Sequence, residues 1–359
     1  YPAPMDREAG IAAYQAMITA EVYQAKSATG ARDHLHLYQN DHESPVIQMT
    51  VAEMEDCPGA VKKYRLSAVD GAELPRWTAG AHLDIVVAPE FLRQYSMCGD
   101  PADLSCYEIA VLQEPEGRGG SQLMHRIFEP GRRIFVSKPI NHFELEASAK
   151  LSLLFGGGIG VTPMLAFAHE LHRQGGAFRL MYSASQKAKA AFDGAFDDFA
   201  WADRVSRHYS DQGTRLDIAQ AVPPYEAGTH MYVCGPGAYM SAILDHARFI
   251  GYPETALHAE FFTPPELPEW ENFPFEIERA NGQKIPVTAS QSASDALIAA
   301  GIPVDVKCAD GLCGVCKCTL LSGEVEHRDF VLSSAQRETT VILCQSRAAE
   351  AGGVLKLDI

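Results

Sequence analysis

The sequence has no apolar run approaching the roughly 20 residues that a membrane-spanning helix needs. Basic residues are scarce as well: 30 Lys and Arg stand against 46 Asp and Glu, giving a formal net charge of −16. Nucleic acids and anionic membranes select basic surfaces, so we expect neither as a partner. The first residues show no secretory signal, and the scattered cysteines do not indicate a disulfide framework. We therefore expect a protein of the reducing cytoplasm.

Four of the nine cysteines form one pattern near the C-terminus. Four residues separate Cys308 from Cys313, two separate Cys313 from Cys316, and 27 separate Cys316 from Cys344. This spacing is typical of the plant-type ferredoxins, in which four thiolates hold a 2Fe–2S cluster. Glycines inside the loop let backbone N–H groups approach the sulfurs. The pattern therefore predicts a 2Fe–2S cluster and a redox-active chain.

Two alternatives to the cluster remain open at this point. A structural zinc site usually pairs one Cys-x2-Cys with another, or with histidines, and neither arrangement is present. Buried free thiols are the second alternative. Cys318 is a rival ligand, although it falls in the expected strand 317–321, where a buried thiol is a simpler interpretation.

The length predicts two or three domains, each with its own core. We expect an N-terminal extension or linker over residues 1–45. Six short antiparallel strands and one helix N-capped by Ser121 predict a small closed β-barrel over residues 46–148. Alternating strands and helices predict a parallel α/β sheet over residues 149–263, ending in a strand 257–262. A β-grasp module with a helix capped by Ser294 is expected over residues 264–359.

Glycines follow the apolar strand 151–155 and lead into a helix. Such a turn brings backbone N–H groups and a helix N-terminus toward a phosphate, although glycine turns also serve tight packing. A second turn, Cys234-Gly235-Pro236, ends a later strand. The carboxyl ends of parallel strands are where open sheets bind ligands, so the two turns together indicate a nucleotide site.

In the expected barrel, Arg93-Gln94-Tyr95-Ser96 places a cation, an aromatic ring and a hydroxyl on one strand. Alternation sends Arg93 and Tyr95 to the same face, where they suit a phosphate and a flavin, with Ser96 near the flavin N5. An ordinary strand with a surface arginine explains the same residues. A glycine turn beginning at Gly117 enters the following helix and suits a terminal phosphate.

Five motifs in chain order resemble the phthalate dioxygenase reductase family of the ferredoxin–NADP reductase superfamily. They are Arg93-Gln-Tyr-Ser96, Gly117-Arg-Gly-Gly-Ser121, Gly156-Gly-Gly-Ile-Gly-Val-Thr-Pro163, Cys234-Gly-Pro236 and the cysteine pattern. The chain is also similar to the reductase portion of self-sufficient haem-thiolate monooxygenases. The resemblance covers about residues 46–359.

The resemblance implies FMN, NADH and a 2Fe–2S cluster as cofactors, with NADPH possible. It assigns FMN to Arg93, Gln94, Tyr95, Ser96, Ala110, Val111, Arg118, Gly119, Gly120 and Ser121. It assigns the nicotinamide dinucleotide to Gly156, Gly157, Gly158, Gly160, Thr162, Pro163, Ser183, Cys234, Gly235 and Pro236. It assigns catalytic positions to Ser96 and Cys234, and to Phe261 or Phe262 as the cover of the flavin ring. It assigns the cluster to Cys308, Cys313, Cys316 and Cys344.

The implied function is electron transfer from NADH through FMN and the cluster to a terminal oxygenase, a Rieske non-haem iron enzyme or a fused haem domain. NADH is favoured because Ser183-Ala-Ser185-Gln-Lys187 lacks an arginine pair for a 2′-phosphate. The alternative function is that of an electron-transfer subunit that does not itself oxidise NADH. We expect a monomer, and the acidic residues Asp310, Glu324 and Glu326 are either a docking surface or a solvated rim.

Overall fold

The computed structural model describes residues 46–88, 91–115, 117, 119–263, 270–306, 308–332 and 334–359. The expected extension over residues 1–45 and the proposed flavin ligand Arg118 lie outside the described residues. The chain divides into two compact units, the first ending at Glu260 and the second running from Phe261 to Ile359. Each unit is described by itself.

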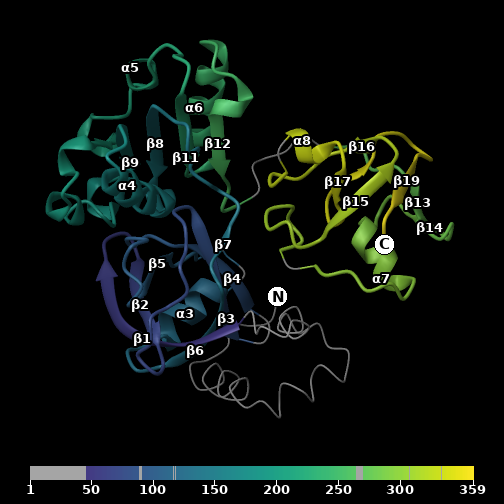
Figure 1. The fold of residues 1–359 in the computed structure, drawn as a ribbon, viewed down its shortest axis with the longest axis horizontal. Helices are drawn as coiled ribbons and strands as arrows, with labels where there is room; N and C mark the ends of the chain where they lie inside the picture. The colour runs from purple at the N-terminus through teal and green to yellow at the C-terminus, as the bar shows by residue number, and fades with distance from the viewer. Residues whose placement is uncertain are drawn as a thin grey trace. The chain divides into compact units, whose positions relative to one another are not determined.

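The first unit begins with an antiparallel seven-stranded sheet (Figure 1). Its strands are β1 (Val46–Cys57), β2 (Val61–Ala68), β3 (Ala81–Ala88), β4 (Phe91–Ser96), β5 (Tyr107–Leu112), β6 (Arg133–Ser137) and β7 (Ile140–Asn141). The order is β4-β3-β6-β1-β2-β5, with β7 paired to β3. A bridge between Met97 and Ile109 joins the two ends, and Cys98 N–H donates to Glu108 O at 2.9 Å. The predicted antiparallel barrel is confirmed.

One helix, α3 (Gly120–Ile127), packs on this barrel through Leu123, Met124 and Ile127, all of them buried. The expected N-cap at Ser121 is wrong. Gly119 occupies the N-cap position at φ 87°, in the left-handed region that glycine tolerates best. The Ser121 hydroxyl lies inside the first turn and instead accepts a hydrogen bond from Glu114 N at 3.1 Å.

The rest of the first unit is a five-stranded parallel sheet. Its strands are β8 (Leu151–Gly157), β9 (Phe178–Ala184), β10 (Val205–Tyr209), β11 (Thr229–Cys234) and β12 (Leu257–Glu260). Its helices are α4 (Thr162–Gln174), α5 (Ile218–Ala221) and α6 (Gly237–Phe249). The order β10-β9-β8-β11-β12 reverses direction between β8 and β11, so the carboxyl ends of these two strands form the topological switch point.

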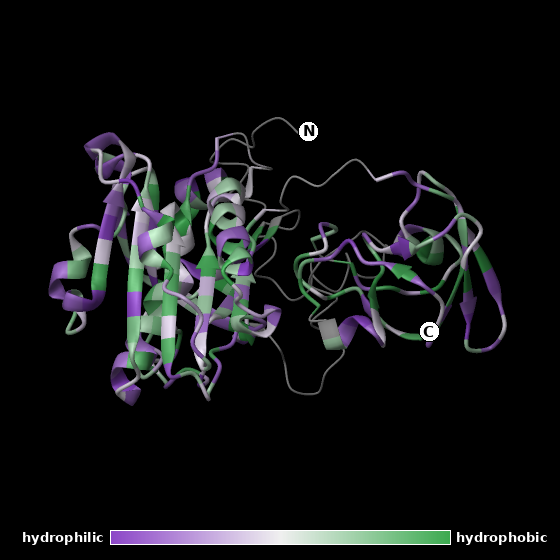
Figure 2. Ribbon diagram, turned by 90° about the horizontal axis from the view of Figure 1, so that it is seen from above, coloured by the Kyte–Doolittle hydropathy of each residue, from purple (hydrophilic) through white to green (hydrophobic). Residues whose placement is uncertain are grey.

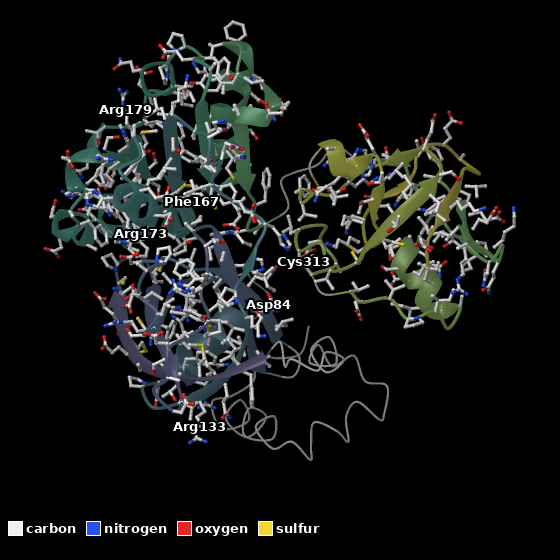
Figure 3. All side chains as sticks on the ribbon, viewed as in Figure 1. Asp84, Arg133, Phe167, Arg173, Arg179 and Cys313 are labelled. Carbon is white, nitrogen blue, oxygen red and sulfur yellow. The ribbon has the colours of Figure 1, made fainter. Side chains whose placement is uncertain are left out.

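Barrel and parallel sheet share one continuous hydrophobic core. Phe143, which follows β7, packs on Phe167 of α4 with ring centroids 5.1 Å apart, and both rings contact Tyr232 of β11. Figure 3 labels Phe167 on α4, and Figure 2 shows hydrophobic residues along the strands with hydrophilic residues toward the outer helices. A buried aromatic side chain contributes about 1.5–3 kcal/mol, so this cluster fixes the two sheets against each other.

The second unit is a β-grasp fold, as predicted. Its strands are β13 (Phe275–Arg279), β14 (Lys284–Val287), β15 (Lys317–Ser322), β17 (Thr340–Ile342) and β19 (Val354–Leu357), with β16 (Val325–Glu326) and β18 (Arg347–Ala348) as a separate pair. Its helices are α7 (Ala293–Ala299) and α8 (Ser334–Arg337). The main order is β14-β13-β19-β15-β17, in which β13 and β19 run parallel.

Two further expectations about element ends are wrong. Helix α7 is capped by Ser292, whose hydroxyl accepts from Asp295 N at 3.1 Å, whereas Ser294 is buried inside the helix. Strand β12 ends at Glu260, so Phe261 and Phe262 lie beyond it. Among the described helices, none combines the length and the apolarity that a bilayer crossing requires.

Candidate functional site

The glycine turn after β8 lies against the end of β11 at the switch point. Gly156 pairs with Cys234 in the parallel register. A Cβ added to Gly160 would lie 2.5 Å from the carbonyl carbon and oxygen of Cys234, so only glycine allows this approach. Gly158 has φ 56° and no heavy atom within 4 Å of an added Cβ, so its backbone faces open space. The structure therefore brings both predicted nucleotide turns together and leaves room beside them.

Helix α4 starts directly behind this turn. A 3₁₀ turn, Gly158–Val161, joins β8 to the helix, and Thr162 and Pro163 are buried in its first turn. The Thr162 hydroxyl donates to Ile159 O at 2.9 Å, which holds the turn closed. A proline in the first turn loses no helical hydrogen bond. Thr162 and Pro163 thus shape the turn.

The barrel motifs meet at the N-terminus of α3. A Cβ on Gly120 would lie 2.4 Å from Arg93 Nε, so the Arg93 side chain lies directly on the glycine backbone. No side chain caps α3 in the described part of the chain. A guanidinium beside a helix N-terminus is suited to a phosphate, so Arg93, Gly119 and Gly120 fit the terminal phosphate of a flavin mononucleotide.

The other proposed flavin residues lie on β4 and β5. Tyr95 is half-buried, and burial raises the pKa of its hydroxyl. The Gln94 amide nitrogen lies 2.8 Å from His82 Nε2, across the β3–β4 pair. Ala110 and Val111 are buried in β5, and their predicted contact with the flavin stays a prediction.

Ser96, at the end of β4, donates a hydrogen bond of 2.8 Å to Glu260 Oε2 at the end of β12. Glu260 pairs in register with Cys234, so three polar groups from the barrel and from two parallel strands converge here. Burial raises the pKa of Glu260 to about 7, although the hydrogen bond from Ser96 opposes this. Burial raises the pKa of the Cys234 thiol well above its ordinary value, and Glu260 adds to the effect, so this thiol stays uncharged.

Sequence reasoning missed Glu260. The residue belongs to no recognisable motif, and 164 positions separate it from Ser96. The one available signal was a carboxylate at the carboxyl end of an expected parallel strand, beside the strand that ends in Cys234.

Phe261 and Phe262 belong to the second unit. The Phe261 ring packs on Phe330 with centroids 5.3 Å apart, and the Phe330 N–H donates to Gly311 O in the cysteine loop. Phe262 is 41% exposed. Their predicted role as a flavin cover stays a prediction.

The four cysteines of the pattern gather in the loop before β15 and after β17; Figure 3 labels Cys313. Side-chain contacts link Cys308 to Cys313 and Cys344, and Cys344 to Cys316. The contacts from Cys313 and Cys344 lower the pKa of Cys308, and the contact from Cys344 lowers that of Cys316. Cys318 is absent from these contacts and lies near Asp358 O at 3.7 Å.

The loop geometry around these thiols depends on glycine. Gly311 and Gly314 have φ 75° and 69°, in the left-handed region. Asp310 N–H donates to Cys308 Sγ at 3.3 Å, as expected where amides stabilise an anionic cluster. Among the described residues, no three His, Cys, Asp or Glu side chains are placed to hold a single metal ion. The four thiols that these contacts join are the donor set that a 2Fe–2S cluster takes.

Comparisons with known proteins agree with this geometry. The family model "2Fe-2S iron-sulfur cluster binding domain" matches residues 277–349. Vanillate O-demethylase oxidoreductase of Pseudomonas sp. (strain HR199 / DSM 7063) is 37% identical over 318 residues, covering 87% of this chain and 100% of that protein.

Two solved structures are similar as well. The structure of phthalate dioxygenase reductase, described as modular for electron transfer from pyridine nucleotides to [2Fe-2S], has a TM-score of 0.63 and 32% identity, covering 88% of this chain and 99% of that one. An intact type IV self-sufficient cytochrome monooxygenase of the haem-thiolate class has a TM-score of 0.80 and 33% identity. The match covers 88% of this chain and spans 41% of the monooxygenase.

Proposed function

Because the chain belongs to the phthalate dioxygenase reductase family, we propose that it takes electrons from NADH and passes them one at a time to a terminal oxygenase. The observation that carries the proposal is the convergence of Ser96, Glu260 and Cys234 beside the glycine turn of β8. A flavin-type motif and a nucleotide-type motif thereby share one site. The relatives named as oxidoreductases or reductases support the same reaction class.

The cofactors follow from matching electron counts. NADH gives up a hydride, which carries two electrons, a 2Fe–2S cluster accepts one electron at a time, and a flavin connects the two steps. FMN fits the barrel because Arg93 lies on Gly120 at an uncapped helix N-terminus, where a terminal phosphate is favoured. Cys308, Cys313, Cys316 and Cys344 would hold the cluster.

The protein's own groups orient the reactants and hold a proton. Ser96 and Glu260 keep a hydrogen-bonded proton where the nicotinamide and flavin sites meet, and the pKa of about 7 leaves Glu260 able to hold or release it near neutrality. The Cys234 thiol is fully buried and neutral, so it brings no charge to the place where the nicotinamide would bind. Gly160 lets the glycine turn approach the Cys234 carbonyl.

The surroundings of β9 and β10 favour NADH over NADPH. Lys187 Nζ lies 4.0 Å from Asp193, and Arg207 pairs with Asp193 and Asp197. Lys187 and Arg207 are therefore already matched by carboxylates. A 2′-phosphate that bound to these two cations would have to compete with Asp193 and Asp197.

Steady-state reduction of ferricyanide by NADH tests the reductase activity, because it needs only the flavin and nicotinamide sites. Cys313→Ser should keep this activity and lose the reduction of cytochrome c. Absence of NADH turnover in the wild type would favour the alternative of an electron-transfer subunit. A kcat/KM for NADPH equal to that for NADH would contradict the preference for NADH.

We propose a Rieske non-haem iron oxygenase as the partner, a reductase that acts as a monomer, and a cytoplasmic location. A fused haem-thiolate monooxygenase is the second candidate system, supported by the TM-score of 0.80 to that class. Reconstitution with a purified Rieske demethylase separates the two: coupled product formation supports the first, whereas electron delivery to a haem domain alone supports the second.

A further inference from the structure

Two hydroxyl oxygens at the carboxyl edge of the parallel sheet are buried and have no hydrogen-bond partner among the described residues: Ser183 Oγ and Tyr239 OH. Ser183 lies in β9, paired in register with Gly157 of β8. Tyr239 lies in the first turn of α6, directly after the Cys234-Gly-Pro turn. Buried hydroxyls are normally hydrogen-bonded, so two hydroxyls without partners beside the nucleotide turns are candidates for binding a polar ligand group.

The Tyr239 ring contacts both glycine turns. A Cβ on Gly157 would lie 2.9 Å from Tyr239 Cδ1, and a Cβ on Gly235 would lie 3.0 Å from the same atom. The ring therefore lies against the backbone of the switch point, next to the residue that precedes Gly158.

The two hydroxyls lie close to each other without forming a hydrogen bond of normal geometry. Burial raises the pKa of Tyr239, and its proximity to Ser183 partly opposes the effect. At neutral pH both groups are therefore O–H donors. No described side chain caps the N-terminus of α6, where Tyr239 lies. Two hydroxyls that can donate at an uncapped helix N-terminus suit an anionic acceptor.

We propose that Tyr239 OH and Ser183 Oγ together donate to the diphosphate of the nicotinamide dinucleotide, which makes Tyr239 a binding residue of the site. The proposal rests on the proposed function, because it assumes that the dinucleotide binds at this edge. It assigns a role to a side chain that stands outside the five sequence motifs. It also gives the two unpartnered hydroxyls one common acceptor.

The test is the equilibrium binding of NAD⁺ and ADP-ribose to the flavin- and cluster-loaded protein, measured by calorimetry. Tyr239→Phe keeps the ring on the glycines and removes only the hydroxyl. Loss of one hydrogen bond to a charged group should raise the Kd about tenfold or more. The increase should be equal for both ligands, because both carry the diphosphate and only one carries nicotinamide. Ser183→Ala should act in the same direction, and the double variant should cost less than the product of the single effects.

Tyr225→Phe is the matched control, since Tyr225 lies in the segment before β11, outside both glycine turns, and its ring contacts the Tyr252 ring edge-on with centroids 5.1 Å apart. It should leave both Kd values unchanged. An unchanged Kd for Tyr239→Phe overturns the assignment of Tyr239, as does a loss seen for NAD⁺ alone. If the wild type binds neither ligand and NADH does not reduce it, the proposed function itself is wrong. Flavin content and cluster absorbance confirm that each variant is folded.

Discussion

Ser96 and Glu260 are joined by a hydrogen bond of 2.8 Å across the two sheets of the first unit. Ser96 ends a barrel strand and Glu260 ends a strand of the parallel sheet, so the contact forms only when both sheets are folded and packed. The pair stands beside Cys234, where both predicted cofactor motifs meet. The protonation of Glu260 should therefore affect both the stability of the first unit and its activity.

The first prediction concerns pH and stability. Burial raises the pKa of Glu260 from its ordinary 4.5 to about 7, so the folded state holds a proton that the unfolded state releases between these values. Stability should thus fall as pH rises from about 4.5 to about 7. The glutamine in Glu260→Gln stays neutral, so the Tm of this variant should rise relative to that of the wild type as the pH increases. Calorimetry between pH 5 and 8 measures both Tm values.

The control for this experiment is Glu254→Gln. The side-chain hydrogen bond from Arg248 lowers the pKa of Glu254, so this pKa shift is opposite in sign to that of Glu260. This variant should show no gain in Tm with rising pH. If the difference in Tm between the wild type and Glu260→Gln stays constant from pH 5 to 8, the pKa of Glu260 is not raised.

The second prediction concerns the rate of flavin reduction. Ser96→Ala removes the hydroxyl that holds Glu260 and should slow reduction by NADH about tenfold in stopped-flow measurements, the scale of one lost hydrogen bond to a charged or reacting group. Ser105→Ala removes an exposed hydroxyl that donates to Asp103, with no Glu260 contact among the described residues, and should leave the rate unchanged. If the two variants are reduced at the same rate, Ser96 has no role in flavin reduction.

The sequence predicted the parts of the site that are local in the chain. The cysteine loop and the glycine turn are contiguous, and their geometry follows from glycine at Gly311, Gly314 and Gly158. The order of the motifs then predicted which sheets carry them. Such sites can be predicted from the sequence because a few neighbouring residues determine their geometry.

The missed features are those that tertiary packing decides. Glu260 becomes part of the site only because β4 and β12 end at the same place, which no window of sequence reveals. Ser121 and Ser292 show the same limit on a smaller scale. A serine near a helix start is a good cap, yet the N-cap of α3 is the left-handed Gly119, two residues before Ser121. In α7, the hydroxyl of Ser292 rather than that of Ser294 accepts the Asp295 N–H.

The third prediction tests the proposed flavin phosphate site. Gly120→Ala would place a Cβ 2.4 Å from Arg93 Nε and must displace the guanidinium. Flavin affinity should fall about tenfold or more, since bonds from a cation to a phosphate are strong. Flavin fluorescence titration measures this. Gly194→Ala is the control, because nothing lies within 4 Å of its added Cβ; an equal loss there would indicate a general effect on folding.

The fourth prediction separates cluster ligands from a bystander thiol. Cys318 is half-buried on β15 and near Asp358 O, outside the contacts that join the other four thiols. Cys318→Ser should keep the visible absorbance and the electron paramagnetic resonance signal of a reduced 2Fe–2S cluster. Cys313→Ser should lose both. Retention of both signals in Cys313→Ser would contradict the assigned ligand set.

The last prediction concerns a buried arginine behind the cysteine loop. Arg328 is only 7% exposed, and its guanidinium bonds to Glu326 and to Asn272 Oδ1 while lying 4.7 Å from the Trp270 ring. Its backbone oxygen lies 3.3 Å from the Cβ position of Gly311, so the same residue ties residues 270–272 to the cysteine loop.

Arg328→Met should therefore destabilise the second unit. Breaking a fully buried ion pair costs about 3–5 kcal/mol, but the partner Glu326 is 37% exposed and can regain water, so we expect about 2 kcal/mol. For a unit of this size, a loss of about 2 kcal/mol lowers the Tm by roughly 10 °C. The Tm is measured as the temperature at which the absorbance of the cluster is lost.

Lys356→Met provides the matched comparison, because it removes a cation whose partner Glu278 lies 3.0 Å away at the surface of the same unit. Exposed pairs contribute about 0–1 kcal/mol, so its transition should shift by only a few degrees. If both variants lose the cluster at the same temperature, burial gives Arg328 no special role. A large shift for Arg328→Met alone means that the segment 270–272 must be anchored for the cysteine loop to keep its shape.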